Sequence, residues 1–153
     1  MLGAVLDRLI PADEFPGAVD AGGLAYIEGI FRRELALELT RFREALQIWD
    51  QAIRADDSSP VADCQKGFAE LSPEAQDVWL RRLEHGELVV VSPKLTAKFF
   101  EQLLNLAAEG FYADPGQDGN RGAISWKMIG YDPRIPGRTT ADFDAAVNPD
   151  GDE

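Results

Sequence analysis

The chain has 153 residues, which suggests a single domain large enough to bury one hydrophobic core. Hydrophobic residues make up 45% of it, as in ordinary folded domains, and no apolar run is long enough to span a bilayer. The net charge of −12 disfavours nucleic acid and anionic lipid as direct partners, because both would repel an acidic chain.

The cysteine content says little about the cellular compartment. Cys64 is the only cysteine, so an intrachain disulfide is excluded. The Arg32-Arg33 pair is not a twin-arginine export signal, because it lies inside a helical pattern and no apolar segment follows it. The sequence as read shows no export leader, which leaves open whether one was removed or never existed.

The N-terminal segment, residues 1–10, is apolar with helical spacing. Pro11 is expected to end it, because the residue before a proline avoids the helical region. The loop that follows contains Asp13 and Glu14. We interpret these as solvated loop acids and not as a catalytic pair, since adjacent positions on a loop point apart.

Residues 24–53 carry one apolar stripe with steps of three and four residues and no proline. This pattern predicts a single long helix, and Asp20 is placed to cap its start. Such a helix would be about 50 Å long, so we also consider a break near its middle.

The next segments are shorter. Residues 55–60 form a break, and a short helix is considered around residues 64–69. Ser72, Pro73 and Glu74 together are a strong helix start, combining a capping hydroxyl, a proline at the first position and a favourable acid. This helix should end before Gly86, with His85 as a capping residue. Its inward side chains are expected to be Val78, Trp79 and Leu83.

Residues 88–91 are apolar but isolated, so we expect an extended connection. Ser92-Pro93 repeats the helix-start signal, and Gly110 is expected to stop that helix. Its core-facing stripe comprises Leu95, Phe99, Leu103, Leu106 and Ala107. Residues 124–129 should form one or two helical turns.

The predicted fold class is therefore all-α. We expect a small helical domain over residues 1–135, with one long N-terminal helix, two or three shorter helices and an irregular Gly/Pro-rich C-terminal region. Residues 136–153 are acidic, contain proline and glycine, and are predicted to be a tail.

The sequence offers no catalytic constellation. A single histidine and a single cysteine argue against a transition-metal site, and no Cys-x-x-Cys-His haem attachment occurs. No Gly-x-Gly-x-x-Gly follows a predicted strand, so a dinucleotide fold is not supported. Asp114, Asp118 and Asn120 in a glycine loop weakly suggest calcium, but their spacing does not match an EF-hand. We therefore assign no catalytic, metal-binding or cofactor-binding residue.

Residues 111–132, FYADPGQDGNRGAISWKMIGYD, combine aromatic rings with glycines. Large rings beside flexible backbone are typical of a surface that is shaped to fit another molecule. The alternative is a connection between helices whose rings fill the chain's own core. The residues alone leave both interpretations open.

The same stretch carries a family resemblance. FYADPG, GNR and WKMIGY resemble the C-terminal signature of the gluconate 2-dehydrogenase subunit 3 family. LIPADEFPGA, residues 9–18, resembles that family's other motif, and the two occur in the expected order over about residues 1–135. The resemblance implies a small accessory subunit, without its own cofactor, of a membrane-associated flavin dehydrogenase that oxidises a sugar, polyol or glycoside.

In that family, FAD, the substrate pocket and the catalytic base belong to a large subunit of the glucose–methanol–choline oxidoreductase type. A cytochrome c subunit commonly takes the electrons. The resemblance implies that the small subunit forms a hetero-complex with the large one, stabilises it and helps its export. The implied location is periplasmic, and the cytoplasm stays open because no leader is seen.

Trp, Tyr and Arg dominate the energetics of protein interfaces. We therefore expect contact or contact-shaping roles for seven residues: Phe111, Tyr112, Pro115, Asn120, Arg121, Trp126 and Tyr131. Arg121 could pair with an acid of the partner, whereas Asn120 is expected to hold the loop. Two rival functions are a stand-alone hydrolase that uses Asp114 or Asp118, and a general folding or export helper.

Overall fold

The computed structural model describes residues 1–56, 65–87 and 93–131, with the backbone alone for residues 93–95. Across these residues the chain is all-α, as predicted, and no strand occurs in them. The α-helices are α1 (Leu2–Leu9), α2 (Gly23–Arg33), α3 (Leu39–Arg54), α4 (Pro73–Glu84), α5 (Pro93–Tyr112) and α6 (Ile124–Met128). Single 3-10 turns lie at Phe68–Glu70, Pro115–Gln117 and Arg121–Ala123.

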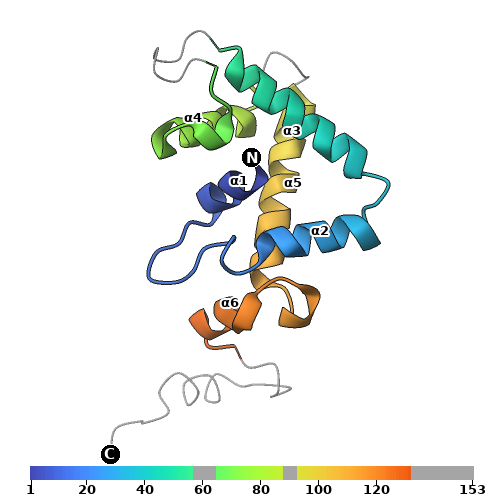
Figure 1. Cartoon of the computed structure of the whole chain (residues 1–153), viewed down its shortest axis with the longest axis vertical. Helices are drawn as coiled ribbons and strands as arrows, with labels where there is room; N and C mark the ends of the chain where they lie inside the picture. Colours follow the sequence, from blue (N-terminus) through green and yellow to red (C-terminus); the bar gives the residue numbers. More distant parts are fainter. Residues whose placement is uncertain (57–64, 88–92, 132–153) are drawn as a thin grey trace, which may run out of the picture.

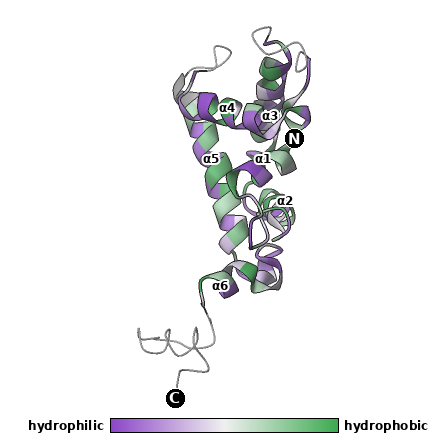
Figure 2. Cartoon of the chain, turned by 90° about the vertical axis from the view of Figure 1, so that its left-hand side faces the viewer, coloured by the Kyte–Doolittle hydropathy of each residue, from purple (hydrophilic) through white to green (hydrophobic). Residues whose placement is uncertain are grey.

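Helix α5 is the axis on which the other helices assemble (Figure 1). Helices α2 and α4 pack against different parts of it, and α1 contacts α2, α4 and α5. Val5 and Leu6 of α1 are fully buried at this junction. Figure 2 shows α1 and α2 on one side of α5, with α6 at its far end. This 20-residue axis, covered by amphipathic helices, buries one continuous core.

The single long helix predicted for residues 24–53 is wrong, because the chain forms α2 and α3 with a turn between them. The N–H groups of Glu34 and Leu35 both donate to the Ile30 carbonyl, at 2.8 and 3.0 Å, which ends α2. The rings of Phe31 and Phe42 then approach to 4.7 Å between centroids. In a continuous helix their backbones would be about 16 Å apart. The break that the sequence allowed therefore falls at residues 34–38.

The start of α2 also differs from the prediction. Its N-cap is Gly22, which has a left-handed conformation with φ of 89°, and no side chain caps the helix. Asp20 therefore does not take the capping position that the sequence suggested.

The two ends of α4 agree with the prediction. Ser72 Oγ accepts a hydrogen bond from the Ala75 N–H at 3.3 Å, and Pro73 is the first helical residue. At the other end, His85 Nδ1 lies 2.7 Å from the Arg81 carbonyl oxygen. His85 is thus a capping residue, as expected.

The inward face of α4 is only partly as predicted. Trp79 and Leu83 are buried, but Val78 points outward and Leu80 is buried instead. The buried positions 76, 79, 80 and 83 follow the spacing of a single helical face, and position 78 lies off it.

Gly110 does not stop α5, which continues to Tyr112. A Cβ atom at Gly110 would lie 3.2 Å from Gly23 Cα and 3.2 Å from the Tyr26 ring. The glycine therefore lets α2 and α5 approach closely, a packing role in place of the predicted helix-ending role.

Polar pairs fasten neighbouring elements. Arg8 of α1 donates two hydrogen bonds to the Asp77 carboxylate of α4, at 2.8 and 2.6 Å. Arg54, near the end of α3, pairs with Asp50 at 2.9 Å and with Glu70 at 3.1 Å. The segment before α4 is thereby held against the C-terminal half of α3.

Cys64 and two predicted segments lie outside the described residues. The segments are the extended connection at residues 88–91 and the tail at residues 136–153. Where the short helix was considered around residues 64–69, the described part forms the 3-10 turn at Phe68–Glu70. No helix of the described residues is long and apolar enough to cross a membrane.

Candidate partner-binding surface

The loops that contain the two motifs singled out in the sequence meet at one end of α5. The loop after α1 and the loop after α5 touch through their backbones, because the Arg121 N–H donates to the Ala21 carbonyl at 2.7 Å. A Cβ atom at Gly22 would lie 2.8 Å from the Asp118 carbonyl oxygen. Only glycine combines this close approach with a left-handed backbone, so the contact between the loops depends on Gly22.

Asn120 fastens the loop that follows α5. Its N–H donates to the Gly110 carbonyl at 2.9 Å, and its Nδ2 donates to the Ala113 carbonyl at 3.0 Å. Its Oδ1 accepts from the Ser125 N–H at 2.9 Å, close to the start of α6. The side chain is fully buried. Asn120 thus holds the loop, as the sequence analysis expected.

The same loop concentrates left-handed backbone. Asp118, Asn120 and Ala123 have φ values of 69°, 42° and 55°, and Gly122 has 70°. Asn and Asp tolerate this region, whereas alanine in it costs about 1–2 kcal/mol. Strained backbone persists only where its surroundings hold it, and it gathers at functional sites.

The loop positions a group of exposed apolar side chains, which we call the aromatic surface: Tyr112, Trp126, Ile129 and Tyr131. Tyr112, Ile129 and Tyr131 are 47%, 45% and 49% exposed, and Trp126 is half-buried. The Trp126 Nε1–H donates to the Tyr112 carbonyl at 3.2 Å. The rings of Trp126 and Tyr131 meet edge to face, with centroids 5.1 Å apart. These contacts hold the Trp126 ring against the end of α5 and the Tyr131 ring against Trp126.

The seven residues expected to contact or shape a contact divide into two groups. Tyr112, Trp126 and Tyr131 present rings at the surface, and Arg121 is exposed beside Gly22. Phe111 is only 3% exposed and Asn120 is fully buried, so both support the surface from inside. Pro115 is half-buried and begins the turn Pro115–Gln117.

Two residues of this region were not singled out from the sequence. Ile129 belongs to the aromatic surface, and its place three residues after Trp126 on a helical turn was the available signal. Arg33 of α2 lies 3.7 Å from the Asp118 carboxylate and joins the loop to α2. No local pattern relates two residues so far apart in sequence.

The acidic side chains that were considered for a hydrolase or a calcium site make hydrogen bonds or ion pairs within the chain. Asp114 Oδ1 accepts from the Gly116 N–H at 2.8 Å, which caps the following turn. Asp118 pairs with Arg33, and in the N-terminal loop Asp13 Oδ1 accepts from the Phe15 N–H at 2.8 Å. Among the described residues, no three His, Cys, Asp or Glu side chains gather as metal ligands would.

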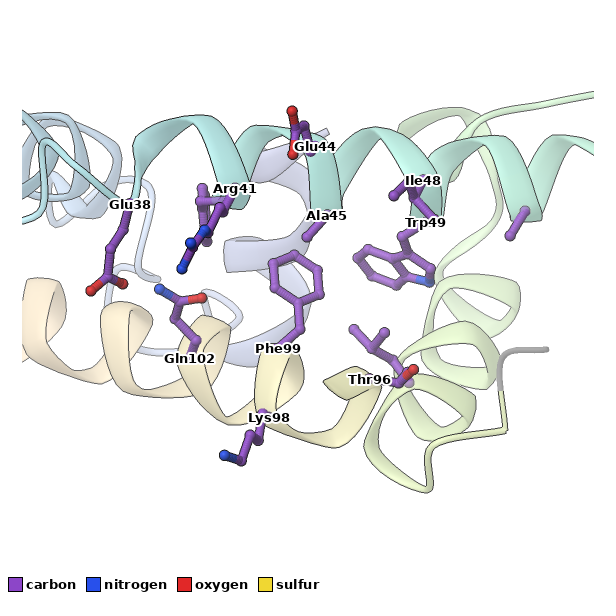
Figure 3. A pocket seen from close by; sticks show the side chains of 13 residues that line it. Glu38, Arg41, Glu44, Ala45, Ile48, Trp49, Thr96, Lys98, Phe99 and Gln102 are labelled. Atoms are coloured by element: carbon purple, nitrogen blue, oxygen red, sulfur yellow. The ribbon is translucent and has the colours of Figure 1, made fainter. Parts of the chain in front are cut away.

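Away from the aromatic surface, a hollow lies between α3 and α5 (Figure 3). Its volume is about 640 Å³, and its apolar lining comes from Phe42, Trp49 and Phe99 with smaller side chains between them. It contains none of the residues singled out from the sequence as a site.

Comparison with known proteins gives one positive result. A family model described as Gluconate 2-dehydrogenase subunit 3 matches residues 1–133, which is most of the chain and includes both motif loops. No curated protein and no solved structure matches the chain.

Proposed function

Since the chain belongs to the gluconate 2-dehydrogenase subunit 3 family, we propose that it is the non-catalytic small subunit of an FAD-dependent dehydrogenase complex. Its work is to bind the large flavoprotein subunit and to stabilise it. A partner that binds only the native state of another chain raises that chain's stability by mass action. The oxidised substrate is a sugar, polyol or glycoside, and FAD and the catalytic groups reside in the large subunit.

The observation that carries this proposal is the aromatic surface. Three rings and Ile129 lie at one end of α5, on either side of a loop that Asn120 and the left-handed residues hold in place. Exposed apolar patches on a folded domain mark interaction sites, and rings held in advance lose little conformational entropy on binding. The exposed Arg121, which lies beside Gly22 on the loop after α5, supplies a charge that can pair with an acid of the large subunit.

The remaining parts of the proposal follow from the family's usual organisation. A cytochrome c subunit is the expected electron acceptor, and the assembled complex is expected in the periplasm. The small subunit also assists export of the large one. A helper with several clients is the alternative, and it would be recognised by recovery of several unrelated large subunits with the tagged chain from the native host.

Trp126→Ala tests the proposed contact. We expect it to weaken binding to the large subunit by about tenfold or more, because truncating a central interface ring commonly costs about 2 kcal/mol. The matched control is Val78→Ala, which truncates an exposed apolar side chain on α4, at the other end of the molecule (Figure 1). The measurement is co-purification followed by titration, with the melting temperature of each free chain recorded. Unchanged affinity together with an unfolded free Trp126→Ala chain would make the ring a core residue.

A further inference from the structure

Helix α3 is held at two separate places. Near its C-terminal end, the rings of Trp49 and Phe68 lie 4.8 Å apart, and the Phe68 N–H donates to Asp50 Oδ1 at 2.9 Å. Near its N-terminal end, the Phe42 ring lies 4.7 Å from Phe31 and 5.7 Å from Phe99 of α5. Of these ring pairs, Phe42–Phe99 lies between α3 and α5.

A groove lies between α3 and α5 (Figure 3). Its floor is buried and apolar, with Phe42, Trp49 and Leu83 almost inaccessible to water. Its open side carries Ala45 and Ile48 from α3 and Phe99 from α5. A volume of about 640 Å³ is within the range of about 300–1,000 Å³ that binding sites occupy.

One end of the groove is polar. In Figure 3 the Arg41 guanidinium and the Gln102 amide point toward each other across it, and the Glu38 carboxylate lies beyond them. In the part of the chain that the structure describes, none of these three side chains has an ion pair or a hydrogen bond. A guanidinium with its donors free is ready to bind a carboxylate of another molecule in bidentate geometry.

The length of the groove indicates what kind of segment fits. From Glu38 to Ala52 along α3 the distance is about 21 Å, which is the rise of four helical turns. Helices that dock in grooves insert apolar side chains spaced at i, i+3 or i+4, and i+7. Of the four charged side chains that line the groove, Figure 3 shows Glu38 and Arg41 beside it, whereas Glu44 and Lys98 point away from the space between the helices. Glu38 and Arg41 carry opposite charges, so this end of the groove lacks the acidity of the whole chain.

We propose that this groove receives an amphipathic α-helix of the large subunit, separately from the contact at the aromatic surface. The helix inserts apolar side chains over Phe99 and Trp49 and places an acidic side chain on Arg41, with a basic one facing Glu38. The inference rests on the proposed function, because it requires that a large subunit binds this chain. It adds a second contact, with an apolar part that gives affinity and a charged end that fixes the direction of the helix.

The first test fills the groove. Ala45→Trp places a large ring in it, and Gln47→Trp places the same ring on an exposed position of α3 as the control. We expect Ala45→Trp to weaken binding of the large subunit by about tenfold or more, as loss of a main anchor does, with Gln47→Trp unchanged. Wild-type affinity in Ala45→Trp would overturn the proposal.

The second test changes charge at an exposed position, where folding is not at risk. Arg41→Glu should weaken the complex, whereas Arg43→Glu, the same change outside this groove, should not. Equal effects would overturn the assigned charge pairing.

Sedimentation of the free chain tests for a different occupant of the groove. If the wild-type chain is a dimer and Ala45→Trp makes it a monomer, a second copy of the chain occupies the groove and the proposal is overturned. If the wild-type chain binds no large subunit, the proposed function itself fails.

Discussion

At the scale of single residues, Asn120 has the strongest structural position in the candidate site. It combines three hydrogen bonds to Gly110, Ala113 and Ser125 with full burial and a left-handed backbone. Asparagine suits this position, because its short amide both tolerates the backbone and satisfies buried groups on either side. The loop after α5 therefore depends on one side chain more than on any of its rings.

Asn120→Ala should lower the free energy of unfolding by about 2–3 kcal/mol. The change leaves the Ala113 carbonyl and the Ser125 N–H without their partner and puts alanine at a positive φ. Urea unfolding measures the effect, and Asn105→Ala, at an exposed position of α5, is the matched control. Equal stability of the two variants would show that the amide does not hold the loop.

The Arg8–Asp77 pair makes stability depend on pH. The hydrogen bonds from Arg8 lower the pKa of the Asp77 carboxyl below its ordinary value. A carboxyl whose pKa is lowered on folding stabilises the protein above its unfolded pKa of about 4, and this contribution is lost as the pH falls through the folded pKa.

A double-mutant cycle with Arg8→Gln and Asp77→Asn should give a coupling of at most about 1 kcal/mol at pH 7, since Asp77 is 36% exposed and water screens the pair. The coupling should be smaller at a pH well below about 4, where a larger share of the Asp77 carboxyls is protonated. Thermal unfolding of the four proteins at both pH values measures it. A coupling that stayed the same in acid would contradict the assigned ion pair.

At the scale of elements, local chemistry in the sequence predicted helix ends where a side chain or a proline decides them. Pro11 follows the C-cap of α1, and Ser72-Pro73 starts α4. The break between α2 and α3 could not be placed, because its segment contains no glycine or proline and depends on the contact between Phe31 and Phe42. That contact joins residues that helical periodicity alone keeps apart.

It was partly predictable which residues of the candidate site are buried and which are exposed. Phe111 lies four residues after Ala107 and continues the core stripe of α5, so periodicity could have placed it inside. Tyr112, one position later, points outward by the same rule. The exposure of Trp126 and Tyr131 could not be predicted from the sequence, because it depends on how the strained loop orients α6 relative to the end of α5.

Gly110→Ala tests the close approach of α2 and α5. The added Cβ atom would crowd the Gly23 backbone and the Tyr26 ring, and we expect a loss of about 1–3 kcal/mol. Gly29→Ala is the matched control, since the three atoms nearest to its Cβ all belong to the flexible end of the Arg33 side chain. There the better helix propensity of alanine should make the change neutral or stabilising by up to about 1 kcal/mol. Urea unfolding separates the two, and a Gly110→Ala variant as stable as the wild type would show that the approach of α2 and α5 does not require glycine.

At the scale of the whole molecule, the chain is a helical framework with two features turned outward. One is the aromatic surface at one end of α5, and the other is the groove between α5 and α3. The carboxylates near the first are engaged in turns or paired with Arg33. The aromatic surface and the groove are the two surfaces to which we assign binding of the large subunit, and the chain belongs to the gluconate 2-dehydrogenase subunit 3 family.

The most direct test of the central claim is purification through a tag on this chain from cells that also express the large subunit, followed by an absorbance spectrum and a dehydrogenase assay. We expect the pure chain to be colourless and inactive, and the complex to show flavin bands near roughly 450 nm with activity. An isolated chain that turns over substrate, or that carries a redox group while no large subunit is recovered with it, would contradict the account.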